Sequence, residues 1–150
     1  MTSDELETRE SIRDTLARYN HSGDRGRLAD LAACFAVDGV LDLPGDDLST
    51  GPQEIEARLS QVVAGSKERS ARPMVHHHVS SVEITLETPD EARVRSYFLV
   101  FTETGLDHWG RYDDRFRRCG ERWLIAHRRV RTDGATPQSR MAVDARIPTS

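Results

Sequence analysis

Three consecutive histidines, His76, His77 and His78, are the residues of this chain best suited to acid–base chemistry. They open an apolar, β-branched run that predicts a strand, and side chains on a strand alternate between its two faces. His77 therefore points to one face of the sheet, while His76 and His78 point to the other. A neutral imidazole that a carboxylate orients and charge-balances is the commonest general base near neutral pH. Asp24 is the candidate carboxylate.

The same histidine run also invites a zinc interpretation. Consecutive strand residues cannot converge on one ion, however, and no second cluster in the sequence has metal-ligand spacing. Cys34 and Cys119 lack such spacing too, and we interpret them as reduced packing residues. The sequence contains no glycine-rich dinucleotide fingerprint. We therefore expect neither a metal nor an organic cofactor.

Length and charge limit the classes of protein to consider. The 150 residues suit a single domain with a real core. The 21 Lys and Arg against 25 Asp and Glu give a formal charge of −4, which offers nucleic acid no electrostatic attraction. Acidic residues interleave with the start of the arginine run between Arg115 and Arg131, which favours a solvated sheet face or a subunit contact over a phosphate site. No apolar run could span a membrane and the N-terminus is charged, so we expect a cytoplasmic protein.

These candidate residues need elements to position them, and helices come first along the chain. Apolar residues at helical spacing predict one helix from Leu6 to Tyr19 that Gly23 breaks, a short second one from near Arg25 to Phe35, and a third after Pro52. A brief strand, 39–43, separates the second helix from the third.

The rest of the chain has the pattern of a sheet. Residues 74–88, 92–104, 107–118 and 121–131 are rich in β-branched and aromatic residues, and turn residues separate them. This order predicts an α+β fold, in which the helices pack on a curved, mostly antiparallel sheet. From Gly134 the composition becomes polar and irregular, so we expect 134–150 to be a tail that is mobile or wrapped on a neighbouring subunit.

Several segments resemble a known family. The segments are 19–24 (Tyr-Asn-His-Ser-Gly-Asp), 77–82 (His-His-Val-Ser-Ser-Val), 110–112 (Gly-Arg-Tyr) and 123–128 (Trp-Leu-Ile-Ala-His-Arg). Together with the order of elements, they look like the SnoaL-like branch of the nuclear-transport-factor-2-like superfamily, over about residues 6–132. The resemblance implies a single cone-shaped α+β barrel, in which three helices close a strongly curved sheet around a largely apolar pocket.

The resemblance also implies roles for individual residues. The branch with scytalone dehydratase, bile-acid dehydratase and hexachlorocyclohexane dehydrochlorinase places an aspartate after the first helix and a histidine at the start of the long strand. Asp24 and His77 match this dyad, and Tyr19 matches a catalytic tyrosine of the bile-acid enzyme. Scytalone dehydratase adds a second histidine from the next strand, whereas 98–104 contains none here. We expect the pocket to be lined by Phe35, Val79, Tyr112 and His127.

Each site residue also has a purely structural interpretation. Asp24 precedes a predicted helix and could be its N-cap, a role worth about 1 kcal/mol. Tyr19 could be core, and His77 could be a buried, hydrogen-bonded histidine. Simple alternation places Val82, Ile84 and Leu86 on the face of His78. We still choose His77, because the family match favours it and because a sheet with helices inside and a subunit contact outside buries both faces.

Two classes of function stay open. The first is a cofactor-independent lyase of the dehydratase type, or an isomerase, that acts on a largely apolar cyclic molecule through Asp24, His77 and Tyr19. A polyketide cyclase is a narrower option within this class. The second is a non-catalytic binding or assembly subunit, like the small subunits of ring-hydroxylating dioxygenases. Apolar residues on both strand parities predict self-association, with a trimer favoured.

Overall fold

The computed structural model of this chain describes residues 1–67 and 74–140. Its elements, in chain order, are α1 (Ser3–Asp24), α2 (Leu28–Ala32), β1 (Phe35–Leu43), β2 (Asp47–Thr50), α3 (Pro52–Lys67), β3 (Val75–Thr88), β4 (Glu91–Thr102), β5 (Gly105–Cys119) and β6 (Arg122–Ala135).

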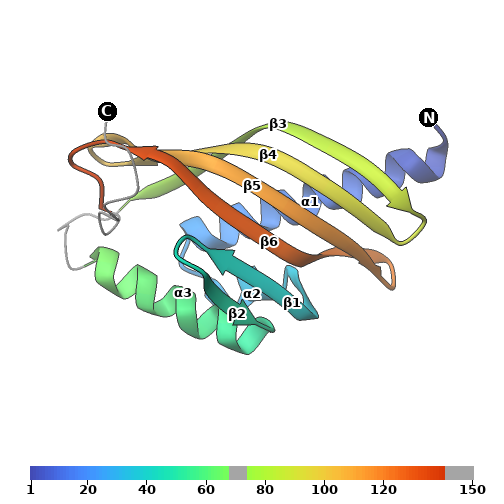
Figure 1. Ribbon diagram of the computed structural model, residues 1–150, viewed down its shortest axis with the longest axis horizontal. Helices are drawn as coiled ribbons and strands as arrows, with labels where there is room; N and C mark the ends of the chain where they lie inside the picture. The colour runs from blue at the N-terminus through green and yellow to red at the C-terminus, as the bar shows by residue number, and fades with distance from the viewer. Residues whose placement is uncertain (68–73, 141–150) are drawn as a thin grey trace.

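The strands form one six-stranded mixed sheet in the order β2-β1-β6-β5-β4-β3. The β1–β6 pair is parallel, and the other pairs are antiparallel. Figure 1 shows the long strands β3 to β6 arching over α1, with α3 beneath β1 and β2. The sheet does not close on itself, because β2 and β3 are its two edges. The expected α+β fold with three helices packed on a curved sheet is confirmed.

Helix α1 is fixed at both ends by its own sequence. Thr2 and Glu5 form a reciprocal capping box at its start. At its end Gly26 adopts a φ of +71°, and the N–H of Arg27 donates to the carbonyl of Ser22, which is a Schellman closure. The helix therefore runs through Gly23, which was expected to break it, and ends at Asp24.

Most of the predicted boundaries hold within a few residues, but three differ. Phe35 begins β1, where a helical position was expected, and β2 was not anticipated. Strand β6 continues to Ala135, so the first two residues of the expected tail belong to the sheet. Residues 136–140 then bond to β5, and the remainder of the tail, 141–150, lies outside the described residues.

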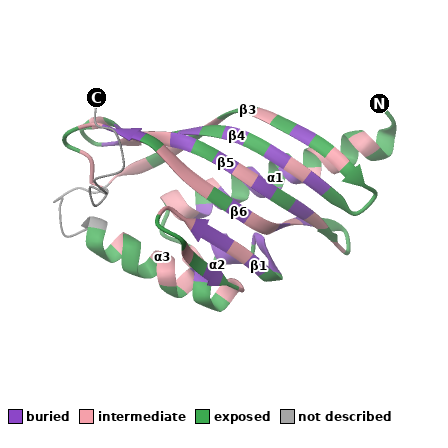
Figure 2. Cartoon of the chain, viewed as in Figure 1, coloured by how far each residue is buried: buried purple, intermediate pink, exposed green. Residues whose placement is uncertain are grey.

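Two apolar clusters lie between the helices and the sheet. The larger one contains the buried stripe of α1, with Ile12, Leu16 and Tyr19, against β1, β5 and β6, although Leu6 from the predicted stripe is exposed. The smaller one consists of Phe98, Val100 and Tyr112, with partly buried valines around it. Figure 2 shows the regular alternation of buried and exposed bands along β4 that supplies Phe98 and Val100. The smaller cluster lies beside the candidate site.

β-bulges interrupt this alternation in the other long strands. In β3, Ser80 pairs with Tyr97 and Glu83 pairs with Arg95, so two residues of β3 oppose only one residue of β4. Ser81 within this bulge has a φ of +51°, which L-residues adopt rarely. A bulge exchanges the faces of all side chains beyond it. This exchange decides which residues reach the interior.

Candidate active site

Asp24 and His77 form the dyad that the sequence predicts. Oδ1 of Asp24 lies 2.6 Å from Nδ1 of His77, and Oδ2 accepts the backbone N–H of His77 at 3.0 Å. Both carboxylate oxygens therefore bind the same residue, which fixes the imidazole plane as well as its position. The side chain of Asp24 is 14% exposed and that of His77 is 27% exposed, so the pair is partly buried but still reaches solvent. Nδ1 holds its proton toward the carboxylate, and Nε2 carries the free lone pair.

His77 faces the helices because of the bulge at Ser81. Without it, His77 would lie on the face opposite to Ile84, which is buried in the core. With the extra residue, both side chains point inward, whereas His76 and His78 are exposed. The choice of His77 over His78 rested on the family match and on the assumption that both faces of the sheet are covered. The bulge is the physical reason that the structure supplies instead.

The N-cap interpretation of Asp24 is wrong. Asp24 is the last residue of α1, and α2 begins after Arg27 with no side-chain cap. The side chain of Asp24 is bonded to β3, so its bonds serve the position of His77.

Tyr19 lies one turn and a half before Asp24 and points into the interior, against a buried ion pair that the sequence did not reveal. Arg128 donates two parallel hydrogen bonds to Asp114, at 2.9 and 2.7 Å, and both side chains have no exposed surface. The guanidinium carbon lies 4.2 Å from the Tyr19 ring centroid and 4.0 Å from that of Tyr112. The cation is thus held between two aromatic faces.

The charges in this group are set by burial and by the ion pair. Burial alone would lower the pKa of Arg128, but the Asp114 carboxylate raises it above its ordinary value, so the guanidinium stays charged. Burial raises the pKa of the Tyr19 hydroxyl. Burial also raises the pKa of the Tyr112 hydroxyl, and the charge of Asp24 adds to that effect. Both phenols therefore stay protonated and can act as hydrogen-bond donors.

Several buried polar side-chain atoms have no hydrogen-bond partner among residues 1–67 and 74–140, and three of them belong to residues near the dyad or the buried ion pair. These three are Nη1 of Arg128, Oδ1 of Asn20 and Oγ1 of Thr132. Asn20 lies one helical turn before Asp24, and Thr132 pairs with Gly110 in the sheet. Unpaired buried polar atoms are costly, and each calls for a functional explanation. A bound ligand or water would satisfy them.

Two of the other predicted lining residues, Val79 and Phe35, lie on the inner face of the sheet. Val79 packs on the cluster of Phe98, Val100 and Tyr112. Phe35 is buried at the other side of Tyr19, with the ring centroids 6.0 Å apart.

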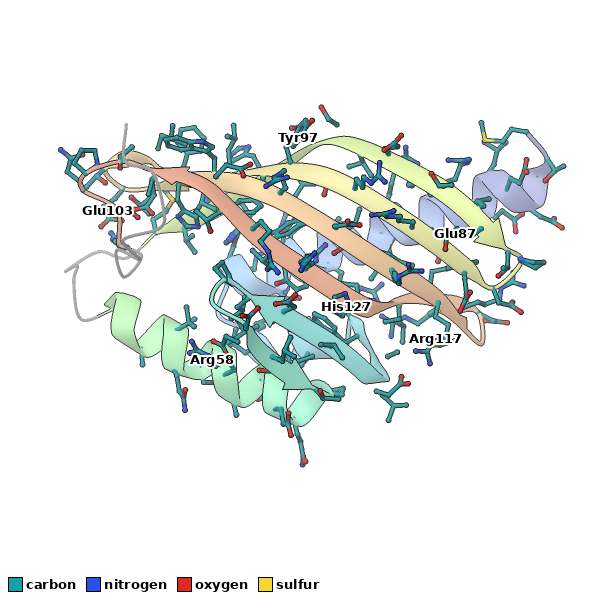
Figure 3. All side chains as sticks on the ribbon, viewed as in Figure 1. Arg58, Glu87, Tyr97, Glu103, Arg117 and His127 are labelled. Carbon is teal, nitrogen blue, oxygen red and sulfur yellow. The ribbon has the colours of Figure 1, made fainter. Side chains whose placement is uncertain are left out.

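His127 does not lie in the interior. An extra residue, Ala126, interrupts the pairing of β6 with β5, so Arg128 turns inward and His127 turns outward. It lies with Arg115 and Glu87 around a cavity on the outer face. Figure 3 labels His127 and Glu87. The arginine run is correctly interpreted as a solvated face for most of its members. Arg128 is the exception, and only the bulge could have indicated it.

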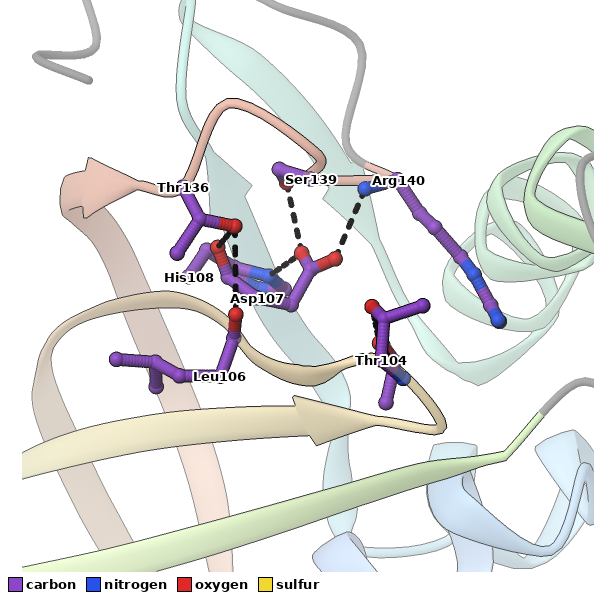
Figure 4. Close-up of polar contacts among 8 residues, drawn as sticks. Thr104, Leu106, Asp107, His108, Thr136, Ser139 and Arg140 are labelled. Carbon is purple, nitrogen blue, oxygen red and sulfur yellow. Dashed lines mark hydrogen bonds and ion pairs between the residues drawn. The ribbon is translucent and has the colours of Figure 1, made fainter. Parts of the chain in front are cut away.

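A second Asp–His pair, which the sequence analysis missed, lies on β5. Nδ1 of His108 is 2.7 Å from Oδ2 of Asp107, and these side chains are 15% and 2% exposed, respectively. Neighbouring residues on a regular strand point to opposite faces, but Asp107 is the extra residue of a bulge opposite β4. Asp107 also accepts hydrogen bonds from the hydroxyl of Ser139 and the N–H of Arg140 (Figure 4).

A cavity in the described part of the chain is lined by Arg18, Ser22, Arg27, Asp30, Ala33 and Arg122, away from the dyad. A ligand pocket beside Asp24 and His77 remains a prediction. No group of three or more His, Cys, Asp or Glu residues within 1–67 and 74–140 is arranged to hold a metal ion. Within the same ranges, no helix has the length and apolarity needed to cross a membrane.

Comparisons with known proteins place this geometry in context. Residues 4–129 match the family model of the SnoaL-like domain. A candidate scytalone dehydratase from Novosphingobium aromaticivorans superposes with a TM-score of 0.80 at 23% identity, covering 99% of this chain and 97% of that one. LinA superposes with a TM-score of 0.76 at 16% identity, covering 94% and 97%. A Catenulispora acidiphila protein in complex with S-DNPA gives 0.72 at 24% identity, covering 83% and 92%. No curated protein sequence matches this chain.

Proposed function

The chain belongs to the SnoaL-like domain family, and from that premise we propose that it is a cofactor-independent lyase of the dehydratase type, or an isomerase, acting on a largely apolar cyclic molecule. The observation that carries the proposal is the 2.6 Å contact between Oδ1 of Asp24 and Nδ1 of His77. Such a contact is expected of a general base whose partner holds one tautomer and balances the charge that develops.

In the proposed reaction, Nε2 of His77 removes a proton from a carbon next to an activating group. The C–H electron pair forms the new double bond, and a C–O bond at the neighbouring carbon breaks. The departing oxygen leaves as water once it receives a proton. Asp24 stabilises the imidazolium that forms. Positioned acid–base groups of this kind contribute on the order of 10²- to 10⁴-fold to the rate.

Hydrogen-bond donors for the substrate oxygens come from Tyr19, Tyr112 and Arg128. Tyr19 is proposed to donate a hydrogen bond or a proton to the departing oxygen. The unpaired Nη1–H of Arg128 adds a charged donor in a water-poor interior, where preorganised donors stabilise developing negative charge most strongly. The required groups are all protein side chains, so the proposed chemistry needs no metal or organic cofactor.

The substrate class follows from the apolar surroundings of His77. Val79, Phe98 and Val100 present methyl groups and a ring, and the Phe98 and Tyr112 rings stack with centroids 4.7 Å apart. Flat aromatic and branched walls favour a ring-containing molecule with few polar groups. The polar atoms of the interior can then fix its orientation.

The test is turnover of a panel of cyclic β-hydroxy ketones. Turnover is measured from the absorbance of the conjugated ketone that the elimination forms. We expect the wild type to act on at least one of them, and His77→Gln to lose a hundredfold or more. His78→Gln, on the exposed side of the same strand, is the matched control and should keep its activity. Equal activity in wild type and His77→Gln would show that His77 is not the general base.

Ligand binding without turnover is the second candidate function. Unpaired buried atoms such as Nη1 of Arg128 and Oδ1 of Asn20 support it, because they call for a ligand but not for a reaction. An assembly subunit like those of ring-hydroxylating dioxygenases belongs to this class. A polyketide cyclase, in contrast, would use the same dyad for catalysis. Tight binding of a cyclic ligand that is returned unchanged would favour binding alone.

Self-association is proposed through the outer face of the sheet, with a trimer favoured. Tyr97 and Leu99 are 56% and 41% exposed, and His78 and Phe101 pack edge to face beside them. We call Tyr97, Leu99, Phe101 and His78 the outer apolar patch. The rest of this face is a ladder of ion pairs, such as Arg93 with Asp113, so the apolar surface is concentrated in one half.

A cytoplasmic location is also proposed. Both cysteines are unpaired, and Cys34 is buried, which is typical of proteins from a reducing compartment.

A further inference from the structure

The second Asp–His pair faces the same interior as the first. His77 pairs with Val100 of β4, and Val100 pairs with His108 of β5, so the three side chains form one row across the sheet. Neighbouring strands are about 4.8 Å apart, which puts the backbones of His77 and His108 roughly 10 Å apart. A ring-sized substrate bound over Val100 would have one imidazole at each side.

The ring of His108 is oriented in the same way as that of His77. Burial raises the pKa of Asp107, but the bonds from Ser139, Arg140 and His108 outweigh this and hold the pKa below its usual value. Asp107 is therefore a carboxylate, and Nδ1 of His108 keeps its proton. Nε2 lies on the opposite edge of the ring and bonds to none of the described residues. The Phe98 ring, with its centroid 6.0 Å away, supports the imidazole edge to face.

The two imidazoles also influence each other. Burial lowers the pKa of His108, Asp107 partly offsets this, and the charge of His77 lowers it further. Two positive charges in this interior are therefore disfavoured, and one proton can be shared between the two rings. When that proton is on His108, Nε2–H of the His108 imidazolium is an acid and Nε2 of the neutral His77 is a base. The lowered pKa of His108 makes its imidazolium the readier proton donor.

A purely structural role for the pair explains less. Anchoring residues 136–140 already satisfies Asp107 through Ser139 and Arg140, without help from a histidine. Tyr19, the other acid candidate, has a pKa raised by burial, so it gives up its proton reluctantly. An imidazolium whose pKa is lowered gives up its proton far more readily than a buried phenol, so His108 fits the role of proton donor better than Tyr19.

We propose that Asp107–His108 is a second proton-transfer pair of the site, with His108 as a catalytic residue and Asp107 as its positioning residue. The inference rests on the proposed function. Neutral His77 takes the proton from carbon, and Nε2–H of the His108 imidazolium gives a proton to the departing oxygen, which leaves as water. His77 then holds one proton more and His108 one proton fewer, and exchange with solvent restores the starting state. In an isomerisation, His108 would return the proton to a second carbon.

The test compares two substrates that give the same product. Elimination from 3-hydroxycyclohexanone and from 3-(4-nitrophenoxy)cyclohexanone yields cyclohex-2-enone, but 4-nitrophenolate leaves without a proton. We expect His108→Gln to lose about 10²- to 10⁴-fold on the alcohol and less than about tenfold on the aryl ether. His77→Gln should lose activity on both, whereas the exposed His78→Gln should lose activity on neither. Equal losses on both substrates for His108→Gln would overturn the acid role.

A second measurement uses the folded wild type and does not depend on turnover. Histidine-ring ¹⁵N spectra are recorded with and without 4-nitrophenol as the probe. A change in the chemical shift of Nε2 in both His77 and His108 on adding 4-nitrophenol would support Asp107–His108 as part of the site. A change at His77 alone would overturn the inference and leave the proposed function in place. If neither signal moves and neither ketone is turned over, both proposals fail together.

Discussion

The bulge at Ser81 sets the face of His77, and its backbone can be tested with glycine. Ser81 has a φ of +51°, a conformation that costs an L-residue about 1–2 kcal/mol and glycine almost nothing. Glycine also loses more chain entropy on folding, by about 0.5–1 kcal/mol. Ser81→Gly should therefore leave the free energy of unfolding unchanged or raise it by up to about 1.5 kcal/mol.

The neighbouring residue provides the matched control. Ser80 is also exposed but lies in a regular pair with Tyr97, so Ser80→Gly should cost about 0.5–1 kcal/mol. Ser81→Val places a β-branched residue in the left-handed region and should cost about 1–3 kcal/mol. The assay is equilibrium urea unfolding of the three variants. Equal destabilisation by Ser80→Gly and Ser81→Gly would refute the left-handed bulge.

Deleting Ser81 tests the consequence for the site. Side chains along β3 would then alternate without interruption. The side chains on one side of the deletion must therefore exchange the inner face of the sheet for the outer one. Ile84 is buried, and keeping such a side chain in the core is worth roughly 1.5–3 kcal/mol, so the half that contains His77 should turn outward. The deletion variant should fold but lack activity and probe binding. Full activity would show that the bulge does not position His77.

Three further predictions concern parts of the molecule away from that bulge. Arg128→Met should lower the free energy of unfolding by about 3–5 kcal/mol in urea, because it leaves Asp114 buried and unpaired; adding Asp114→Leu should recover most of the loss. Tyr97→Lys with Leu99→Lys should shift the mass found by light scattering toward the 16.9 kDa monomer, and an unchanged larger mass would exclude the outer apolar patch as the contact. Asp107 has a lowered pKa when folded, so it stabilises the protein above its unfolded pKa of about 3.9 and loses that contribution as the pH falls through the folded value. In urea unfolding measured from pH 6 to pH 3, the free energy of unfolding of Asp107→Asn should fall less steeply with decreasing pH than that of the wild type. An equally steep fall in both would contradict the lowered pKa of Asp107.

The order of elements could be predicted from sequence because the signals are local. Helical spacing marked α1 and α3, and β-branched runs with turn residues marked the four long strands. The end of α1 was predicted wrongly, because Gly23 was expected to break the helix. The side chain of Leu31 lies 3.0 Å from the place of a Cβ on Gly23, so this glycine allows α2 to pack closely, and Gly26 ends the helix.

The dyad could be predicted from motifs, but much of its surroundings could not. Faces were assigned by strict alternation, and one extra residue in a strand reverses every assignment beyond it. For this reason Arg128 was not expected in the interior. His127 was expected there from the family resemblance, and the extra residue Ala126 turns it outward. The same cause hid Asp107 and His108, because adjacent strand residues were not expected to share a face. Bulges depend on pairing between strands that are distant in sequence, so no local pattern marks them.

The central claim is that Asp24 and His77 act together as a catalytic pair, and a double-mutant cycle tests it most directly. The turnover of one cyclic β-hydroxy ketone is measured for wild type, Asp24→Asn, His77→Gln and the double variant, with urea unfolding as the control for folding. We expect each single substitution to lower kcat by a hundredfold or more, and the double variant to lose scarcely more than either, because residues that act as a unit are strongly non-additive. Undiminished turnover in Asp24→Asn, or losses that multiply in the double variant, would contradict the account.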